Sequence, residues 1–142
     1  MKIFRSDDGK AAFVRLLPGD DLLQGLNRAA AELGYDAATL SIVGGVQNLV
    51  VACFDQQKKE YRDPLRYDEA MVISGGTGNV SLKDGKPFVH IHVTGSDSEG
   101  KSAGGHLMDG TRVYMIEAYF RVLEGPAPVR ELDAEVGLPV WH

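Results

Sequence analysis

Hydrophobic and polar residues alternate along most of this chain, and one segment follows the spacing of a helix instead. Between positions 20 and 33, apolar residues recur at intervals of three or four, as on one face of an α-helix. They are Leu22, Leu26, Ala29, Ala30 and Leu33. Asp20 and Asp21 offer N-cap oxygens, and Gln24 follows Asp21 at the spacing of a capping box. Gly34 is suited to end the helix, so the pattern predicts one amphipathic helix over residues 20–33.

Seven further segments alternate, or carry short apolar runs, in the way that is typical of β-strands. They cover residues 11–17, 39–43, 49–54, 60–67, 70–82, 87–94 and 111–123. Pro64 predicts an edge strand or a break in the fourth segment. The glycines at 75–78 interrupt the fifth segment, and because no helix pattern follows them, they indicate a bulge or a close-packing site rather than a phosphate loop. Asp84 and Gly85 predict a two-residue hairpin turn.

These elements predict an α+β domain with a mainly antiparallel sheet of about seven strands and one main helix. Seven strands at about 4.8 Å spacing span roughly 33 Å, whereas one helix covers about 10 Å. Much of the sheet surface therefore needs another cover, and further copies of the chain would supply it.

The domain is expected to occupy residues 1–125, and a tail follows at residues 126–142. The tail carries apolar side chains that are unusual for a free end: Val136, Leu138, Val140 and Trp141. Segments that remain disordered are poor in such residues. We therefore expect the tail to pack on the domain or on a neighbouring subunit, with Leu138 and Trp141 substantially buried.

The charge balance bears mainly on nucleic acid binding. The 142 residues include 15 Lys and Arg against 20 Asp and Glu, which gives a formal net charge of −5. Nonspecific affinity for DNA depends on basic side chains that neutralise phosphates, and the sequence lacks the Arg-Gly-Arg core of an AT-hook. We expect little binding to DNA.

The sequence also indicates a cellular setting. It has no apolar stretch long enough for a signal peptide or a membrane span, so a cytoplasmic protein without membrane contact is expected. Its single cysteine, Cys53, excludes an internal disulfide. Because Cys53 lies in the apolar run at 49–54, we predict a buried, inert thiol.

The candidate chemistry lies on the segment at 87–94. Alternation places His90 and His92 on one face of a strand, and Val89, Ile91 and Val93 on the face that would join the core. Residues two apart on a strand are roughly 6.5–7 Å apart at Cα. From that spacing, two imidazoles can reach one metal ion.

A third histidine follows after a turn. Residues 97–101 resemble a three-residue hairpin loop with glycine at the position that needs a positive φ. If Asp97 pairs with Lys101, His106 lies opposite His92. A bulge at Gly104 and Gly105 would change that register. Three histidines with an open fourth position suit zinc, although nickel, copper or iron could bind the same residue types. Solvated or hydrogen-bonded strand histidines are the alternative.

An open metal position could hold a small molecule or an anion, or activate water with a carboxylate as the base. The candidate bases are Asp97, Glu99, Asp109 and Glu117. Glu117 shares a face of segment 111–123 with Val113 and Tyr119, and an interface salt bridge is its alternative role. The other face of this segment is predicted to be core and carries Tyr114, Ile116, Ala118, Phe120 and Val122.

Several motifs together resemble the plants-and-prokaryotes-conserved (PPC) domain family. They are Ser-Gly-Gly-Thr-Gly at 74–78, Asp84-Gly85-Lys86-Pro87 leading into His90-Ile91-His92, and Gly104-Gly105-His106-Leu107 with Gly110. The resemblance extends from about Phe13 to Leu123. It implies a homotrimer and a three-histidine metal-binding unit at His90, His92 and His106.

Two classes of function follow from this resemblance. In the first, the chain is a metal-binding homotrimer with zinc and a small-molecule or anion ligand. In the second, it is a DNA-binding or transcription-regulatory module, as the plant members are, which carry the domain behind AT-hooks. This chain resembles the stand-alone bacterial members, and its acidic charge favours the first class. No sequence feature identifies a substrate or a reaction.

Overall fold

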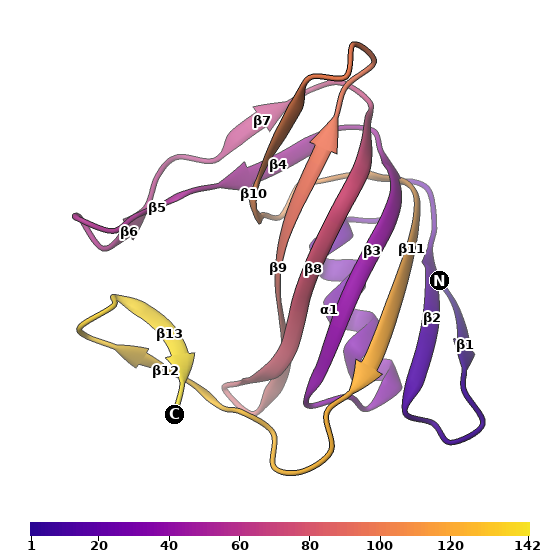
Figure 1. The fold of residues 1–142 in the computed structure, drawn as a ribbon, viewed down its shortest axis with the longest axis vertical. Coiled ribbons are helices and arrows are strands. Elements are labelled where there is room, and N and C mark those ends of the chain that lie inside the picture. The colour runs from indigo at the N-terminus through magenta and orange to yellow at the C-terminus, as the bar shows by residue number, and fades with distance from the viewer.

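The computed structural model describes all 142 residues and contains one helix and thirteen strands. Nine strands form one antiparallel sheet (Figure 1). Across the sheet they are β1 Lys2–Arg5, β2 Ala11–Leu16, β11 Val113–Val122, β3 Ala38–Val46, β8 Met71–Lys83, β9 Lys86–Ser96, β10 Ser102–Leu107, β4 Leu49–Ala52 and β7 Leu65–Tyr67. The predicted α+β class is confirmed. The expected number of strands was too low, because β1, β10 and the two short strands of the tail were not counted and two of the expected segments are each divided into two strands.

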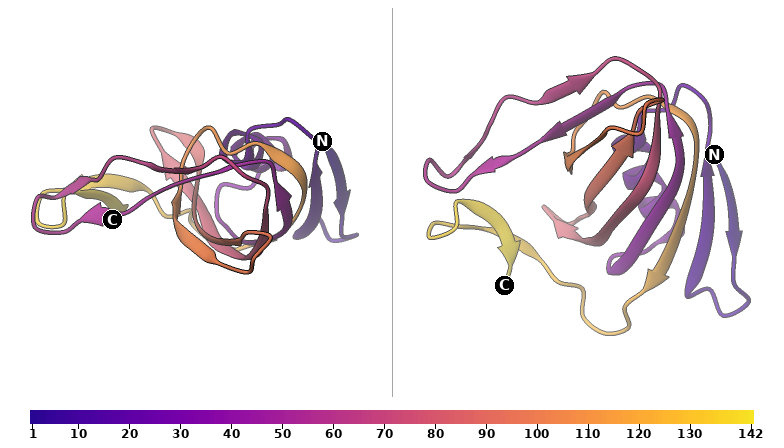
Figure 2. Two further views of the ribbon diagram at one scale, coloured as in Figure 1. Left: turned by 90° about the horizontal axis from the view of Figure 1, so that it is seen from above. Right: turned by 45° about the horizontal axis from the view of Figure 1, so that its top comes forward.

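Four short strands lie outside this sheet, in two hairpins. They are β5 Phe54–Asp55 with β6 Glu60–Tyr61, and β12 Arg130–Asp133 with β13 Leu138–Trp141. Both hairpins project to the same side of the molecule (Figures 1 and 2), and Lys59 Nζ donates a hydrogen bond of 3.0 Å to the carbonyl oxygen of Ala134. Pro64 lies in the break between β6 and the edge strand β7, as predicted.

Helix α1, Leu22–Leu33, begins and ends at the predicted signals. Asp21 is the N-cap, and its side chain accepts a hydrogen bond of 3.2 Å from the backbone N–H of Gln24. Gly34 closes the helix in the left-handed conformation, at φ 71°. The reciprocal half of the capping box does not form, because the Gln24 side chain donates to Asp109 instead.

The core lies between helix α1 and one face of the sheet (Figure 1). Its largest fully buried side chains include Phe120, Ile91 and Ile116 from the strands and Leu22 and Leu26 from the helix. The opposite face, here called the outer face, carries exposed hydrophobic side chains. They are Phe13, Val43, Val72 and Tyr114, which are 55–67% exposed. The single helix thus leaves much of the sheet uncovered, as expected from the number of strands.

Strands β8 and β9 are the longest pair of the sheet, and glycines determine both the turn between them and a shift in their register. Asp84 and Gly85 connect them with φ values of 52° and 71°, which a two-residue hairpin turn requires. The register shifts next to Gly75, and a side chain at Gly78 would collide with the carbonyl oxygen of His90. The glycines are therefore a bulge and a close-packing site within one continuous strand.

The predicted core face of β11 is wrong at its start. Val113 is buried and Tyr114 is 67% exposed, which reverses the alternation expected from the sequence. The cause is a register shift between Val113 and Met115 where β11 pairs with β3, because a bulge moves the adjoining side chains to the other face. From Ile116 to Phe120 the predicted alternation is present.

The prediction of a buried thiol at Cys53 is also wrong, because this residue is exposed. Strand β4 ends at Ala52, where the chain leaves the main sheet for the projecting β5–β6 hairpin (Figure 1). Residues 49–52 are buried as expected. The one helix of the protein lacks the length and hydrophobicity that a membrane crossing needs.

The tail forms the β12–β13 hairpin and reaches the domain through Arg130. The guanidinium of Arg130 lies 5.6 Å from the Phe88 ring of β9 and 5.4 Å from the Trp141 ring of the tail itself. Leu138 is half-buried, but Trp141 is 51% exposed. Trp141 is therefore not buried against the chain's own core, and its burial against a neighbouring copy stays a prediction.

Candidate metal centre

Strand β9 presents two different faces, as the alternation predicts. Val89, Ile91 and Val93 are 1–3% exposed and belong to the core beneath helix α1. The Asn27 side chain of the helix fixes the strand further, because its Oδ1 accepts a hydrogen bond of 2.9 Å from the backbone N–H of Val89. His90 and His92 therefore both project from the face of β9 that is opposite the core.

The hairpin from β9 to β10 adds the third histidine in the predicted register. Asp97 Oδ1 accepts hydrogen bonds from the backbone N–H groups of Glu99 at 2.8 Å and Lys101 at 2.9 Å, and Gly100 adopts φ 80°. The strands then pair without a bulge, and His106 lies directly opposite His92.

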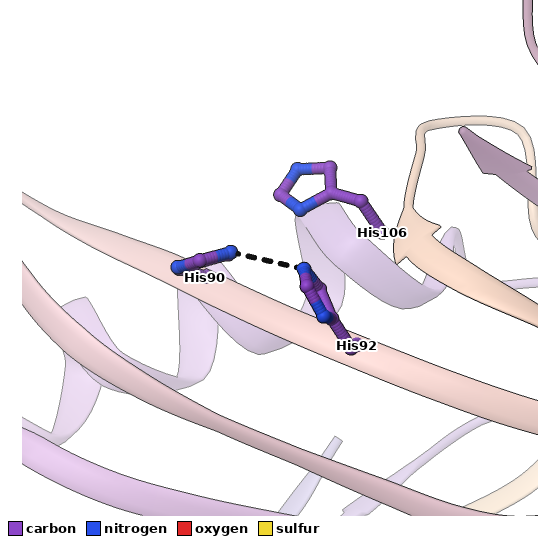
Figure 3. Close-up of side chains that lie close together, drawn as sticks. All are labelled: His90, His92 and His106. Atoms are coloured by element: carbon purple, nitrogen blue, oxygen red, sulfur yellow. Dashed lines mark hydrogen bonds between the residues drawn. The ribbon is translucent and has the colours of Figure 1, made fainter. Parts of the chain in front are cut away.

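The three imidazoles converge on one point in space (Figure 3). Their ring centroids are 5.0–5.5 Å apart, and the Nε2 atoms of His90 and His92 are 3.3 Å apart. Ligands at 2.0–2.1 Å in a tetrahedral zinc site are roughly 3.3 Å from one another. One nitrogen from each ring lies within 4.8 Å of the others.

An unpartnered nitrogen at His106 fits the presence of a metal ion. The Nδ1 atom of His106 is buried and has no hydrogen-bond partner. Figure 3 shows this nitrogen on the side of the ring that faces the other two histidines. A buried polar atom without a partner costs about 1–3 kcal/mol, and a metal ion between the rings would remove that cost. His90, His92 and His106 would be its ligands.

Burial and positive charge keep two of the rings neutral. Burial lowers the pKa of His106 to about 4, and the neighbouring His90, His92 and Arg130 act in the same direction. Burial also lowers the pKa of His90, with smaller contributions from Arg130 and His92. A metal ion binds only the neutral imidazole, so both residues are ready for metal binding at neutral pH.

Two residues beside the cluster were missed by the sequence analysis. Arg130 Nη2 lies 3.4 Å from His90 Nδ1, and the same guanidinium donates to Ser81 Oγ at 2.7 Å and to Asn79 Oδ1 at 2.9 Å. The ring of Tyr61, from the β5–β6 hairpin, lies 5.2 Å from the ring of His106. No spacing in the sequence connects either residue to the histidine that it contacts, which lies 40 positions away for Arg130 and 45 positions away for Tyr61.

None of the four predicted carboxylate bases joins the histidine cluster. Asp97 holds the backbone of its own turn, and Glu99 pairs with Lys101 at 2.6 Å. Asp109 accepts a hydrogen bond from Gln24 of the helix. Glu117 shares the outer face but lies on β11, three strands from β9, which is roughly 14 Å at 4.8 Å per strand. The prediction of a nearby carboxylate is therefore wrong.

Comparisons with known proteins agree with the fold. A metal-containing protein from Archaeoglobus fulgidus is 39% identical, with a TM-score of 0.88 over 100% of this chain and 99% of its own. A plant- and prokaryote-conserved (PPC) protein from Pyrococcus horikoshii is 30% identical, with a TM-score of 0.86 over 99% of this chain and 93% of its own.

The sequence also matches part of a longer curated protein. The bifunctional protein GlmU of a Synechococcus strain is 35% identical over 102 residues, which are 71% of this chain and 15% of that protein. The chain thus matches only a small part of the curated relative's length. The family model of the Plants and Prokaryotes Conserved (PCC) domain matches residues 5–123. Since that match includes all three histidines and most of the chain, this protein belongs to the Plants and Prokaryotes Conserved domain family.

Proposed function

We propose that this protein is a homotrimer in which each chain binds one divalent metal ion, zinc, through His90, His92 and His106. The observation that carries the proposal is the convergence of three imidazoles around the buried, unpartnered Nδ1 of His106. The name of the Archaeoglobus relative supports it, because that protein contains metal and is 39% identical to this chain. Zinc is the preferred ion because three histidines with a vacant fourth position are typical of its sites.

The donor set determines what such a centre can do. Three neutral imidazoles leave the charge of a divalent ion uncompensated and leave one position free, so the bound ion would act as a Lewis acid toward a small ligand. The chain adds Arg130 beside His90 and no carboxylate within the cluster. The centre is therefore suited to holding a small molecule or an anion at the free position.

The outer face supports the homotrimer. Its exposed hydrophobic side chains include Val72 and Tyr114, which also line a surface hollow of about 360 Å³. Apolar patches of this kind are typical of surfaces that contact another protein. We expect light scattering on the purified protein to give three times the chain mass of 15.4 kDa. A monomeric mass would contradict the trimer.

Metal analysis of the purified protein tests the site directly. We expect close to one zinc equivalent per chain, and loss of the metal in His92→Ala and His106→Ala. His142→Ala is the matched control, because this fourth histidine is exposed at the end of the tail and outside the cluster. Metal-free protein, or equal metal content in all variants, would overturn the proposal.

The alternative, a DNA-binding or regulatory module, has less support. It depends on the plant members of the family, whereas the net charge of −5 opposes contact with phosphates.

A further inference from the structure

The surroundings of the histidine cluster leave one direction open. The Tyr61 ring covers His106 on one side, and Arg130 from the tail lies against His90 on another. His90 and His106 are half-buried, whereas His92 is exposed. A ligand that approaches a metal ion in this cluster would therefore arrive over His92.

A hollow of about 380 Å³ lies next to His92. Seven residues of β8, β9 and β10 line it, and Val93 is the one hydrophobic residue among them. Its lining residues are Gly75, Gly76, Thr77, His92, Val93, Thr94 and Gly105. A Cβ atom built at Gly75 meets no atom within 4 Å, so the missing side chain leaves open space above the strand. Ligand sites commonly enclose 300–1,000 Å³, which makes this hollow suitable for a small metabolite.

Polar groups of the hollow lie beside the histidines. Thr77 on β8 pairs directly with His92, and Thr94 follows His92 by two residues on the same face of β9. Both threonines are exposed, and a hydroxyl group can donate as well as accept a hydrogen bond. The floor of the hollow thus offers two hydroxyl groups to a ligand that is anchored over His92.

The charge of the centre selects an anion. No carboxylate belongs to the cluster, so a divalent ion there keeps its two positive charges. Arg130 adds a third positive charge beside His90. An oxyanion is the ligand that compensates this charge, and its oxygen suits the free position of a zinc site.

We propose that the hollow beside His92 binds the organic part of a small oxyanion, whose carboxylate or phosphate group takes the free position on the metal. This inference rests on the proposed function, because it requires a metal ion at the three histidines. A molecule with hydroxyl or further oxygen groups beyond its anionic end would use Thr77 and Thr94.

Protein loaded with cobalt(II) in place of zinc provides the measurement, because a change of ligand at cobalt alters its visible absorption. The probes are acetate, which reaches only the metal, malate, which adds a hydroxyl and a second carboxylate, and inorganic phosphate. We expect all three to change the spectrum, and malate to bind about tenfold more tightly than acetate through its extra hydrogen bonds. The relative affinities of acetate and phosphate show which anionic group the centre prefers.

Two variants separate the hollow from the metal. Gly75→Val fills the open space and should lower malate affinity about tenfold while acetate affinity changes less than twofold. Thr94→Val removes one hydroxyl and should lower malate affinity about threefold to tenfold. Thr39→Val is the matched control, because Thr39 is also an exposed strand threonine of this sheet and does not line the hollow. It should leave both affinities unchanged.

The outcomes distinguish this inference from the proposed function. If the protein binds cobalt but no anion alters its spectrum, or if Gly75→Val binds malate as tightly as the unchanged protein, the inference about the hollow is overturned and the metal site stands. If cobalt does not bind and the histidine variants behave like the unchanged protein, both are overturned. Metal content measured after each titration controls for removal of cobalt by malate.

Discussion

The two faces of strand β9 differ in almost every physical respect. Val89, Ile91 and Val93 are nearly inaccessible and pack beneath helix α1. His90 and His92 project from the opposite face, where no helix covers the sheet (Figures 1 and 3). Because side chains alternate along a strand, one segment of the sequence provides both the core of the fold and two of the candidate ligands.

The fold and the site are therefore set by interleaved but separable residues. The core face is fixed by hydrophobic burial, which the helix completes within the chain. The face of β9 that carries His90 and His92, here called the histidine face, depends on segments from elsewhere in the sequence. Tyr61 and Arg130 reach it from the two projecting hairpins. Substitutions on the two faces should consequently have different effects, and these can be measured.

The largest effect is expected from the core face. Ile91→Ala removes a fully buried side chain, and such truncations cost about 2–5 kcal/mol. His92→Ala, one position away and exposed, should change the free energy of unfolding of the metal-free protein by less than about 1 kcal/mol. Urea unfolding of the metal-free variants measures both values. Equal destabilisation by the two substitutions would show that the faces are not separable.

The histidine face should make the stability of the metal-free protein depend on pH. The pKa of His106 is lowered from 6.5 to about 4 in the folded state, so the unfolded chain binds more protons between these values. The contribution of His106 to the free energy of unfolding should therefore be fully present above pH 6.5 and be lost as the pH falls toward 4. Because the ring is partly solvated, we expect a loss on the order of 1–2 kcal/mol.

Thermal unfolding of metal-free protein between pH 7 and 4 measures this loss. The control is His106→Gln, in which the decrease over the same range should be smaller. Zinc added at pH 7 should raise the melting temperature of the unchanged protein, since it binds the folded state. A profile that is identical in both proteins would assign the pH dependence to other groups.

How far the sequence predicts this site depends on the distance between the residues along the chain. Alternation and one turn suffice to place His106 opposite His92, because register is set by the loop that connects two strands. Helix α1 was predicted to within two residues from caps and apolar spacing. These features are local, and local patterns determine them.

The errors of the sequence analysis come from contacts and irregularities that no local pattern records. Tyr114 was placed in the core because the bulge before Met115 leaves no trace in the alternation. Cys53 was expected to be buried because the point where β4 leaves the sheet lies inside an apolar run. Arg130 and Tyr61 were missed because tertiary contacts bring them to the cluster from distant segments.

A smaller effect is expected where the tail meets the histidine face. The Arg130 guanidinium donates to Ser81, Asn79 and the carbonyl oxygen of Pro139. Arg130→Met loses these bonds while keeping much of the side-chain length, so the attachment of the tail to the domain should weaken by about 1 kcal/mol. Faster hydrogen exchange in residues 130–141 would measure this. Glu131→Gln, at an exposed neighbouring position, should exchange like the unchanged protein.

The smallest effect is expected for the binding of DNA. Several basic side chains are already paired with acids: Lys10 with Glu124, Arg28 with Asp20, Arg62 with Asp55, and Lys101 with Glu99. On the outer face, Arg15 of β2 stands opposite Glu117 of β11. A chain of net charge −5, in which four of the 15 basic side chains are already paired with acids, releases few counterions from a phosphate backbone. We therefore expect no gel shift of duplex DNA at nanomolar protein in about 150 mM salt. A specific shift under these conditions, unchanged in the metal-free His92→Ala variant, would move the function of the outer face from metal chemistry to nucleic acid recognition.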